Sequence, residues 1–255
     1  HAGNGFRMVP MMKTCVMLDP NFVDAYLLGS WHLAYNLTAH LAITPEPLKK
    51  YSEKYKRRLG AREEWYFIAG DFLKDGIRKN PRDYRLYFDL GYAIYDVKLQ
   101  DWPSSVLYLR EATRHRHDRW VPRRLAMSLM RNGQYEDAIT EWTKYHEKFP
   151  ENPVAERFIL VNKGYLAEAQ LDEAFECAAA AKSVAETKTK QSESARANGD
   201  EAAANRLAGE AQKALDDSTA MEDIAAIEKE NAFSIWKPMV DAEQDPLAIS
   251  RVARL

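Results

Sequence analysis

The chain of 255 residues has few of the residues that build covalent or metal-bound frameworks. It contains two cysteines, Cys15 and Cys177, which lie far apart and form no Cys-x-x-Cys or Cys/His spacing. This spacing argues against a disulfide framework, a zinc site and a haem attachment motif. We therefore expect both thiols to pack as small apolar side chains around a hydrophobic core.

Long uncharged stretches are equally scarce. The one that approaches the length of a membrane span runs from Ala25 to Pro45. His32, Asn36 and His40 recur within it at every fourth residue, which places a polar stripe on one face of a helix and indicates an amphipathic segment. The two histidines would lie about 12 Å apart along that helix, too far for one ion, so we expect no metal site.

The sequence also lacks the marks of the common enzyme classes. It has no Walker loop, Rossmann glycine pattern, GxSxG elbow or HExxH motif. Its six histidines include none beside a plausible nucleophile, and its net charge of −2 gives no reason to expect nucleic acid. We expect no enzymatic activity, no cofactor, no small-molecule substrate and no nucleic-acid partner.

What the sequence does contain is an internal repeat. Residues Gly133 to Ala138 read GQYEDA, which is typical of the tight turn and second-helix start of a helix–turn–helix repeat. Leu125 and Ala126 then mark the point where the two helices cross, and Pro150 ends the second helix. The unit is complete over this stretch.

Upstream, prolines bound further units of the same kind. Pro20 and Pro81 each follow a second helix, while Pro103 opens one at its first turn, where its missing N–H costs nothing. The expected second helices contain Met8, Met12 and Cys15, then Ala69, Leu73 and Gly76, then Ser105, Leu109 and Ala112. The expected first helices are Asp24 to Ala42, Tyr84 to Tyr95 and Arg119 to Met130. The first of these second helices has no partner before it, so we expect the chain to begin inside a repeat.

Through YxxLG at Tyr87 to Gly91, GQYEDA and the closing prolines, the chain resembles the tetratricopeptide repeat (TPR) family over roughly residues 1 to 152. The resemblance implies an all-α fold in which helical hairpins stack as a right-handed superhelix, an α-solenoid. Pro20 and Pro81 lie much further apart than the family period of about 34 residues. We expect the surplus, a basic insertion at about 43–62, to form a loop plus an extra or extended helix.

The second half of the chain changes in composition. We expect a repeat domain at 1–183, ending in a degenerate fifth repeat around Tyr165 and Leu171 to Ala174, and a helical C-terminal extension at 184–255. The extension is rich in Ala, Glu and Lys and breaks at Asn198 to Asp200, where Asp200 can cap a new helix. This pattern predicts two long exposed helices paired as a hairpin, with Pro238 interrupting the last helical segment.

In the TPR family, one face of each first helix lines a concave groove. The resemblance places these residues there: Trp31, Arg85, Phe88, Tyr92, Trp120, Arg123 and Arg157, with Asp24, Leu27, Met127 and Arg131 beside them. Aromatic rings give contact area at low entropy cost, and guanidinium groups bind carboxylates in a bidentate fork. We therefore expect a protein partner with an acidic or amphipathic segment. The alternative at each position is that the ring packs in the core and the arginine is solvated.

Two functions remain open from the residues. One is a non-catalytic scaffold or assembly subunit of a larger bacterial complex, which binds a partner in the groove. The other is a structural spacer that assembles through its C-terminal helices. The positions that the family uses to bind chaperone C-termini hold Leu27, Trp31 and Asp89, which argues against that ligand. The basic run Arg114 to Arg119 fits either a solvated loop or a contact with an anionic partner.

Two further segments bear on location. LDPNFVDAY at Leu18 to Tyr26 and RKNPRDYRLYFDLGY at Arg78 to Tyr92 are similar to bacterial TPR proteins that carry an N-terminal membrane anchor or export signal. This resemblance implies membrane association through an anchor preceding His1. It favours a membrane-associated or periplasmic location over a cytoplasmic one.

Overall fold

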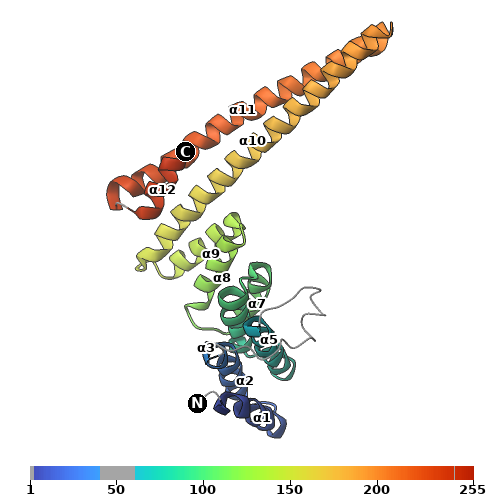
Figure 1. Ribbon diagram of the computed structural model, residues 1–255. Helices are drawn as coiled ribbons and strands as arrows, with labels where there is room; N and C mark the ends of the chain where they lie inside the picture. Colours follow the sequence, from blue (N-terminus) through green and yellow to red (C-terminus); the bar gives the residue numbers. More distant parts are fainter. Residues whose placement is uncertain (1–2, 41–60, 244) are drawn as a thin grey trace. The chain divides into compact units, whose positions relative to one another are not determined.

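The computed structural model describes residues 3–40, 61–243 and 245–255, and these form helices joined by short connections, with no strand among them (Figure 1). The predicted all-α class is confirmed. The chain divides into two compact units, His1–Asn152 and Pro153–Leu255. The boundary expected at 183/184 falls inside one unbroken helix, α10 (Pro153–Ala197), and the second unit begins at Pro153 instead.

The first unit is a series of helices in which each packs against its neighbours in the chain. They are α1 (Gly3–Leu18), the run of α2 (Val23–Trp31), η1 (His32–Leu37) and α3 (Thr38–His40), α5 (Ala61–Lys79), the run of α6 (Tyr84–Phe88) and η2 (Asp89–Leu99), α7 (Trp102–Arg114), α8 (Val121–Arg131) and α9 (Tyr135–Lys148). These helices match the predicted first and second helices closely. The basic insertion expected at about 43–62 lies outside the described residues except for its last two positions in α5.

Local chemistry explains where these helices begin and end. Gly133 has a φ of 75°, a left-handed conformation that favours glycine, and it forms the tight turn between α8 and α9. Asp83 and Asp101 cap α6 and α7 by accepting hydrogen bonds from the backbone N–H groups of Arg85 and Ser104. Pro103 lies in the first turn of α7, as predicted.

The helices of the first unit meet across two clusters of buried apolar side chains. The first joins α1, α2, α5 and η2 around Tyr26, Leu73 and Leu90, and the second joins α6, α7 and α8 around Leu109 and Leu125. Near the second cluster lies a buried polar network. Ser105 and Ser128 share a hydrogen bond of 2.9 Å, and Ser128 Oγ donates to Asp96 Oδ2 at 2.5 Å. Arg131 also pairs with Asp96, so the buried carboxylate is neutralised.

Two first helices contain π-helical segments, η1 and η2, which the sequence did not predict. A π-helical turn holds more residues than an α-helical turn because its hydrogen bonds join residues five apart. Side chains beyond such a turn therefore point in directions that a regular helical period does not predict. Both segments contribute residues to the candidate site described below.

The second unit is a long helical hairpin closed by a short helix (Figure 1). α10 packs along α11 (Glu201–Glu243), and α12 (Pro246–Arg254) packs on α11. Asp200 caps α11 by accepting from Ala203 N at 2.9 Å, so the predicted break and hairpin are confirmed. The fifth repeat is wrong: Tyr165 and Leu171 to Ala174 lie in α10, with no turn between them. Pro238 also lies inside α11, which continues to Glu243.

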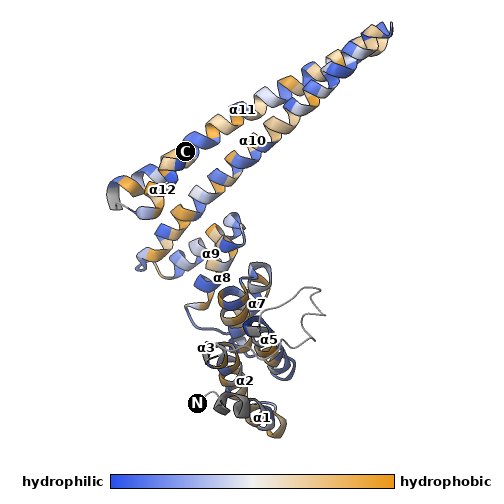
Figure 2. Ribbon diagram, viewed as in Figure 1, coloured by the Kyte–Doolittle hydropathy of each residue, from blue (hydrophilic) through white to orange (hydrophobic). Residues whose placement is uncertain are grey.

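Residues at every seventh position, all of them small except Leu171, form the seam of this hairpin. They are Gly164, Leu171, Ala178, Ala185 and Ser192 on α10 and Ala204, Ala211, Ser218, Ala225 and Ala232 on α11, and each is buried. Ser192 Oγ donates to Ala204 O at 2.7 Å and Ser218 Oγ to Ala178 O at 3.0 Å, which fixes the register. The spacing is that of a coiled coil, and hydrophobic and hydrophilic residues alternate along both helices (Figure 2).

We expect Ala225→Leu to destabilise the second unit. Ala225 is 1% exposed in the seam, so a larger side chain would force α10 and α11 apart and lower the free energy of unfolding by about 1–3 kcal/mol. The neighbouring change Ala226→Leu adds the same side chain at an exposed position and is the matched control. Thermal unfolding followed by circular dichroism measures both. Equal melting temperatures for the two variants would contradict this packing.

Candidate functional site

Five aromatic side chains of the first unit form a candidate binding surface, the aromatic strip. They are Trp31, Tyr35, Phe88, Tyr92 and Trp120. They come from the first helix runs that begin at α2 and α6 and from the N-cap of α8. Four of these five residues were predicted from the sequence. Phe88 contacts Tyr92 and Trp120, whereas Trp31 contacts Tyr35, which lies near Tyr92.

One end of the strip is built on η1. The Trp31 ring is 47% exposed and stacks on Tyr35, with ring centroids 6.1 Å apart. The Tyr35 hydroxyl donates to Ala93 O at 3.1 Å and so ties η1 to η2. Burial and the nearby Tyr92 and Asp89 raise the pKa of Tyr35 to about 12. The exposed indole therefore rests on a neutral ring that is held in place.

The other end of the strip is built on Phe88. This ring is buried and packs in the core, as the alternative interpretation allowed. Trp120 meets it edge to face with centroids 4.4 Å apart and remains 40% exposed, and Tyr92 lies 5.3 Å from it. Phe88 is thus the support on which two more accessible rings are fixed.

Cations lie over two of the rings. Lys98 Nζ is 3.7 Å from the centroid of the Tyr35 ring, and the Arg124 guanidinium is 4.4 Å from that of Tyr92. Both distances fit cation–π interactions. Burial lowers the pKa of Lys98, with a further contribution from Arg62. Sequence reasoning missed Tyr35 and Lys98, because η1 and η2 turn their side chains away from a regular helical period. It also missed Arg124, which lies on the regular helix α8 next to the predicted Arg123.

Asp89 is the acidic residue beside the strip. Burial raises the pKa of its carboxyl from 3.8 to about 6, and nearby Arg85 opposes only part of this rise. Within the described part of the chain the Asp89 carboxylate makes no hydrogen bond or ion pair. A charged Asp89 is therefore unfavourable in the folded state.

The predicted arginines take different positions. Arg85 binds Asp83 and Asp24 at the start of α6. Arg123 lies over the ring of Tyr145 on α9, at 5.8 Å from its centroid, whereas its neighbour Arg124 reaches the strip. Arg157 belongs to the second unit, where its guanidinium binds the buried carboxylate of Asp245 at 2.5 Å.

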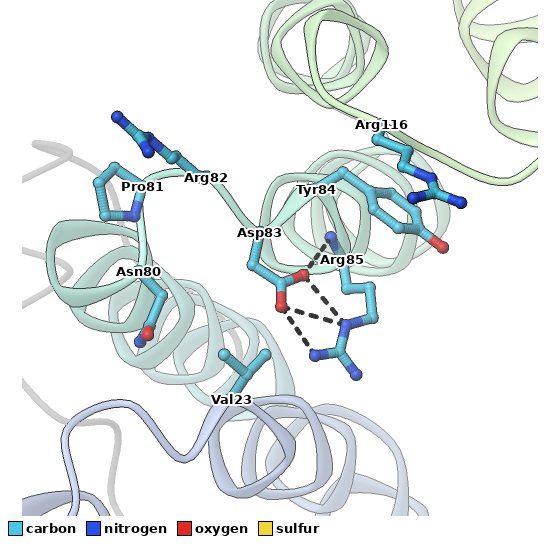
Figure 3. A pocket seen from close by; sticks show the side chains of 8 residues that line it. All are labelled: Val23, Asn80, Pro81, Arg82, Asp83, Tyr84, Arg85 and Arg116. Carbon is cyan, nitrogen blue, oxygen red and sulfur yellow. Dashed lines mark hydrogen bonds and ion pairs between the residues drawn. The ribbon is translucent and has the colours of Figure 1, made fainter.

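A pocket of about 620 Å³ surrounds Arg85 (Figure 3). We name it the arginine pocket, and it is lined by Val23, Asn80, Pro81, Arg82, Asp83, Tyr84, Arg85 and Arg116. Asp83 accepts from Arg85 Nη2 at 2.7 Å and from Nε, and these hydrogen bonds lower the pKa of its carboxyl. Arg116 belongs to the basic run at Arg114 to Arg119, so this run borders a defined pocket.

The described residues contain no group of three or more His, Cys, Asp or Glu side chains placed to hold a metal ion. None of the helices in that part of the chain is both long and apolar enough to cross a membrane. No protein-family model matches the chain, and no curated protein matches it. The function is therefore argued from the aromatic strip and the arginine pocket themselves.

We expect Asp89→Asn to change stability in a pH-dependent way. The folded protein holds the Asp89 proton more firmly than the unfolded chain does, so the wild type loses stability as pH rises from about 4 to about 7. The variant avoids this loss and should gain up to about 3 kcal/mol near pH 8, with little gain near pH 4.5. Urea unfolding at both pH values measures the difference.

Asp217→Asn removes an exposed carboxylate of α11 and is the control for that measurement. Its effect on the free energy of unfolding should be small at both pH values. A gain for Asp89→Asn that is the same at both would show that burial of the charged carboxylate is not its cause.

Proposed function

We propose that the protein is a non-catalytic scaffold or assembly subunit of a larger bacterial complex, and that it binds a segment of a protein partner on the aromatic strip. The proposal treats the first unit as a TPR-like α-solenoid. Three features support that fold: successive helices pack in chain order, Gly133 forms the expected turn, and small residues lie at the predicted crossings. In such a fold the first helices line the concave face.

The observation that carries the proposal is that the strip presents two exposed tryptophans on fixed supports. Trp31 and Trp120 rest on Tyr35 and Phe88, so little side-chain entropy is lost when a partner covers them. Tryptophan and arginine dominate the binding energy of most protein interfaces. The two rings that would make the main contacts are therefore held in position before a partner binds.

The charges beside the strip favour a peptide segment over a purely apolar ligand. Lys98 and Arg124 lie over Tyr35 and Tyr92, while Asp89 offers a carboxylate without a partner among the described residues. Charges around an apolar centre set the orientation of a partner more than its affinity. We infer an amphipathic segment that covers the rings and reaches the charged residues around them.

The second candidate function, a spacer that assembles through its C-terminal helices, is favoured by one observation. α10 is 45 residues long, or about 65 Å at 1.5 Å per residue, and its seam with α11 is continuous. Phe175 and Ile227 are 53% and 60% exposed on this hairpin. Either residue offers a contact point for a neighbouring subunit.

We expect Trp31→Ala combined with Trp120→Ala to reduce capture of the native partner about a hundredfold, because two anchor side chains are lost. The matched variant, Phe175→Ala with Ile227→Ala, removes two exposed apolar side chains from the hairpin. Quantitative mass spectrometry of affinity-purified complexes from the native source compares both with the wild type. Circular dichroism confirms that helicity is kept.

The pair of variants separates the two functions. Loss of the partner in the tryptophan variant alone supports binding on the strip. Loss in the hairpin variant alone would support the spacer and overturn the strip assignment.

A further inference from the structure

The arginine pocket lies where two connections of the first unit meet, one between α5 and α6 and the other between α7 and α8. Figure 3 shows Arg82 on one connection and Arg116 on the other, with the Asp83–Arg85 pair between them. The aromatic strip does not use Arg82, Asp83 or Arg116. The pocket is therefore a second site with its own chemistry.

The cations of the pocket are not equivalent. The Arg85 guanidinium is already neutralised, because it binds Asp83 and also Asp24, whose Oδ1 lies 2.9 Å from its Nη1. Arg82 and Arg116 are exposed, and within the described ranges neither forms an ion pair or a hydrogen bond through its side chain. These two guanidinium groups are available to an anion.

The connection that carries Arg116 is fixed on both sides of it. The His115 ring stacks on Tyr87 with centroids 5.3 Å apart, and His117 meets the edge of Tyr84 at 6.5 Å. Tyr84 also donates its hydroxyl hydrogen to Asp118 Oδ2 at 2.9 Å. Because the backbone of this connection is already ordered, an anion that binds Arg116 does not have to order it.

We propose that the arginine pocket binds acidic side chains, glutamate or aspartate carboxylates, of a protein partner, and that Arg82 and Arg116 each bind one of them. The inference deepens the proposed function and rests on it, because it names the chemistry that the partner offers at a second point of contact. The fork of each exposed guanidinium group matches the two oxygens of one carboxylate. The apolar walls of Val23, Pro81 and Tyr84 suit the methylene stem that carries it.

The charge balance favours a carboxylate over a phosphate. Asp83 lies within the pocket, and Asp24 adjoins it through Arg85. These carboxylates repel a phosphoryl group, with its charge near −2, more strongly than a carboxylate with a charge of −1. Nucleic acid needs cations along a row of phosphates, and here acidic residues interrupt the basic ones.

The test uses the full-length chain and fluorescein-labelled peptides without aromatic residues. One peptide alternates glutamate and glycine, a second has glutamine in place of glutamate, and a third has phosphoserine. Fluorescence anisotropy should show that the glutamate peptide binds about tenfold or more tightly than the glutamine peptide. It should also bind more tightly than the phosphoserine peptide. The double variant Arg82→Gln with Arg116→Gln should lose the preference for glutamate.

The matched control is Arg206→Gln with Lys213→Gln, which changes the net charge equally on the exposed surface of α11. It should bind the glutamate peptide as the wild type does. An equal loss of glutamate-peptide binding in both double variants would mean that net charge alone attracts the peptide, and it would overturn the assignment of the pocket as the binding site. Tighter binding of the phosphoserine peptide, or of a labelled single-stranded oligonucleotide, would overturn the carboxylate assignment.

Failure of the pocket assignment can be told apart from failure of the proposed function. The peptides differ only in their charged or amide side chains and carry the same label, so a preference for glutamate does not depend on the strip. If Trp31→Ala with Trp120→Ala leaves both partner capture and peptide binding intact, the strip is wrong and the pocket stands. If capture falls in the tryptophan variant but no glutamate preference is found, the pocket is wrong and the strip stands.

Discussion

Close approach between helices, at residues with little or no side chain, is the constraint on which the rest of this structure depends. A Cβ on Gly91 would lie 3.0 Å from Leu109 Cγ and 3.1 Å from Leu109 N, so η2 and α7 pack nearly backbone to backbone. In the second unit, a Cβ on Gly164 would lie 2.4 Å from the ring of Trp236. The alanines of the hairpin seam extend the same packing along α10 and α11. Seams this narrow leave no room for further large side chains.

In the first unit the rings of Tyr26 and Trp142 are buried, whereas those of Trp31 and Trp120 remain partly exposed. The buried network of Asp96, Ser105 and Ser128 acts with the narrow seam, because its hydrogen bonds are satisfied only in one register of η2, α7 and α8. Fixing that register also fixes Phe88 on α6 against Trp120 at the start of α8. The hydrogen bonds of this network and the contact of Phe88 with Trp120 thus position this end of the aromatic strip.

The sequence predicted the helices of the first unit well, because prolines, capping aspartates and Gly133 act locally. The prediction failed where the relevant sequence pattern repeats over a longer distance. The heptad spacing of small residues in α10 and α11 was present in the sequence, yet composition alone led to a boundary at 183/184. Tyr35 and Lys98 could not be found from a regular period, because η1 and η2 change the direction of their side chains. Arg124, and not the predicted Arg123, lies over the ring of Tyr92, so the prediction for this helix was wrong by one residue.

Asp89 is a group beside the strip whose charge is unfavourable in the folded protein. Its carboxylate is partly buried, its pKa is raised to about 6, and it makes no ion pair or hydrogen bond among the described residues, so its charge lowers the stability of the folded protein near neutral pH. An asparagine of nearly the same shape would avoid that loss. Groups with strongly shifted pKa values are concentrated at sites where proteins bind or react. We propose that this carboxylate, which lies near Tyr35, takes part in the recognition of a partner on the strip.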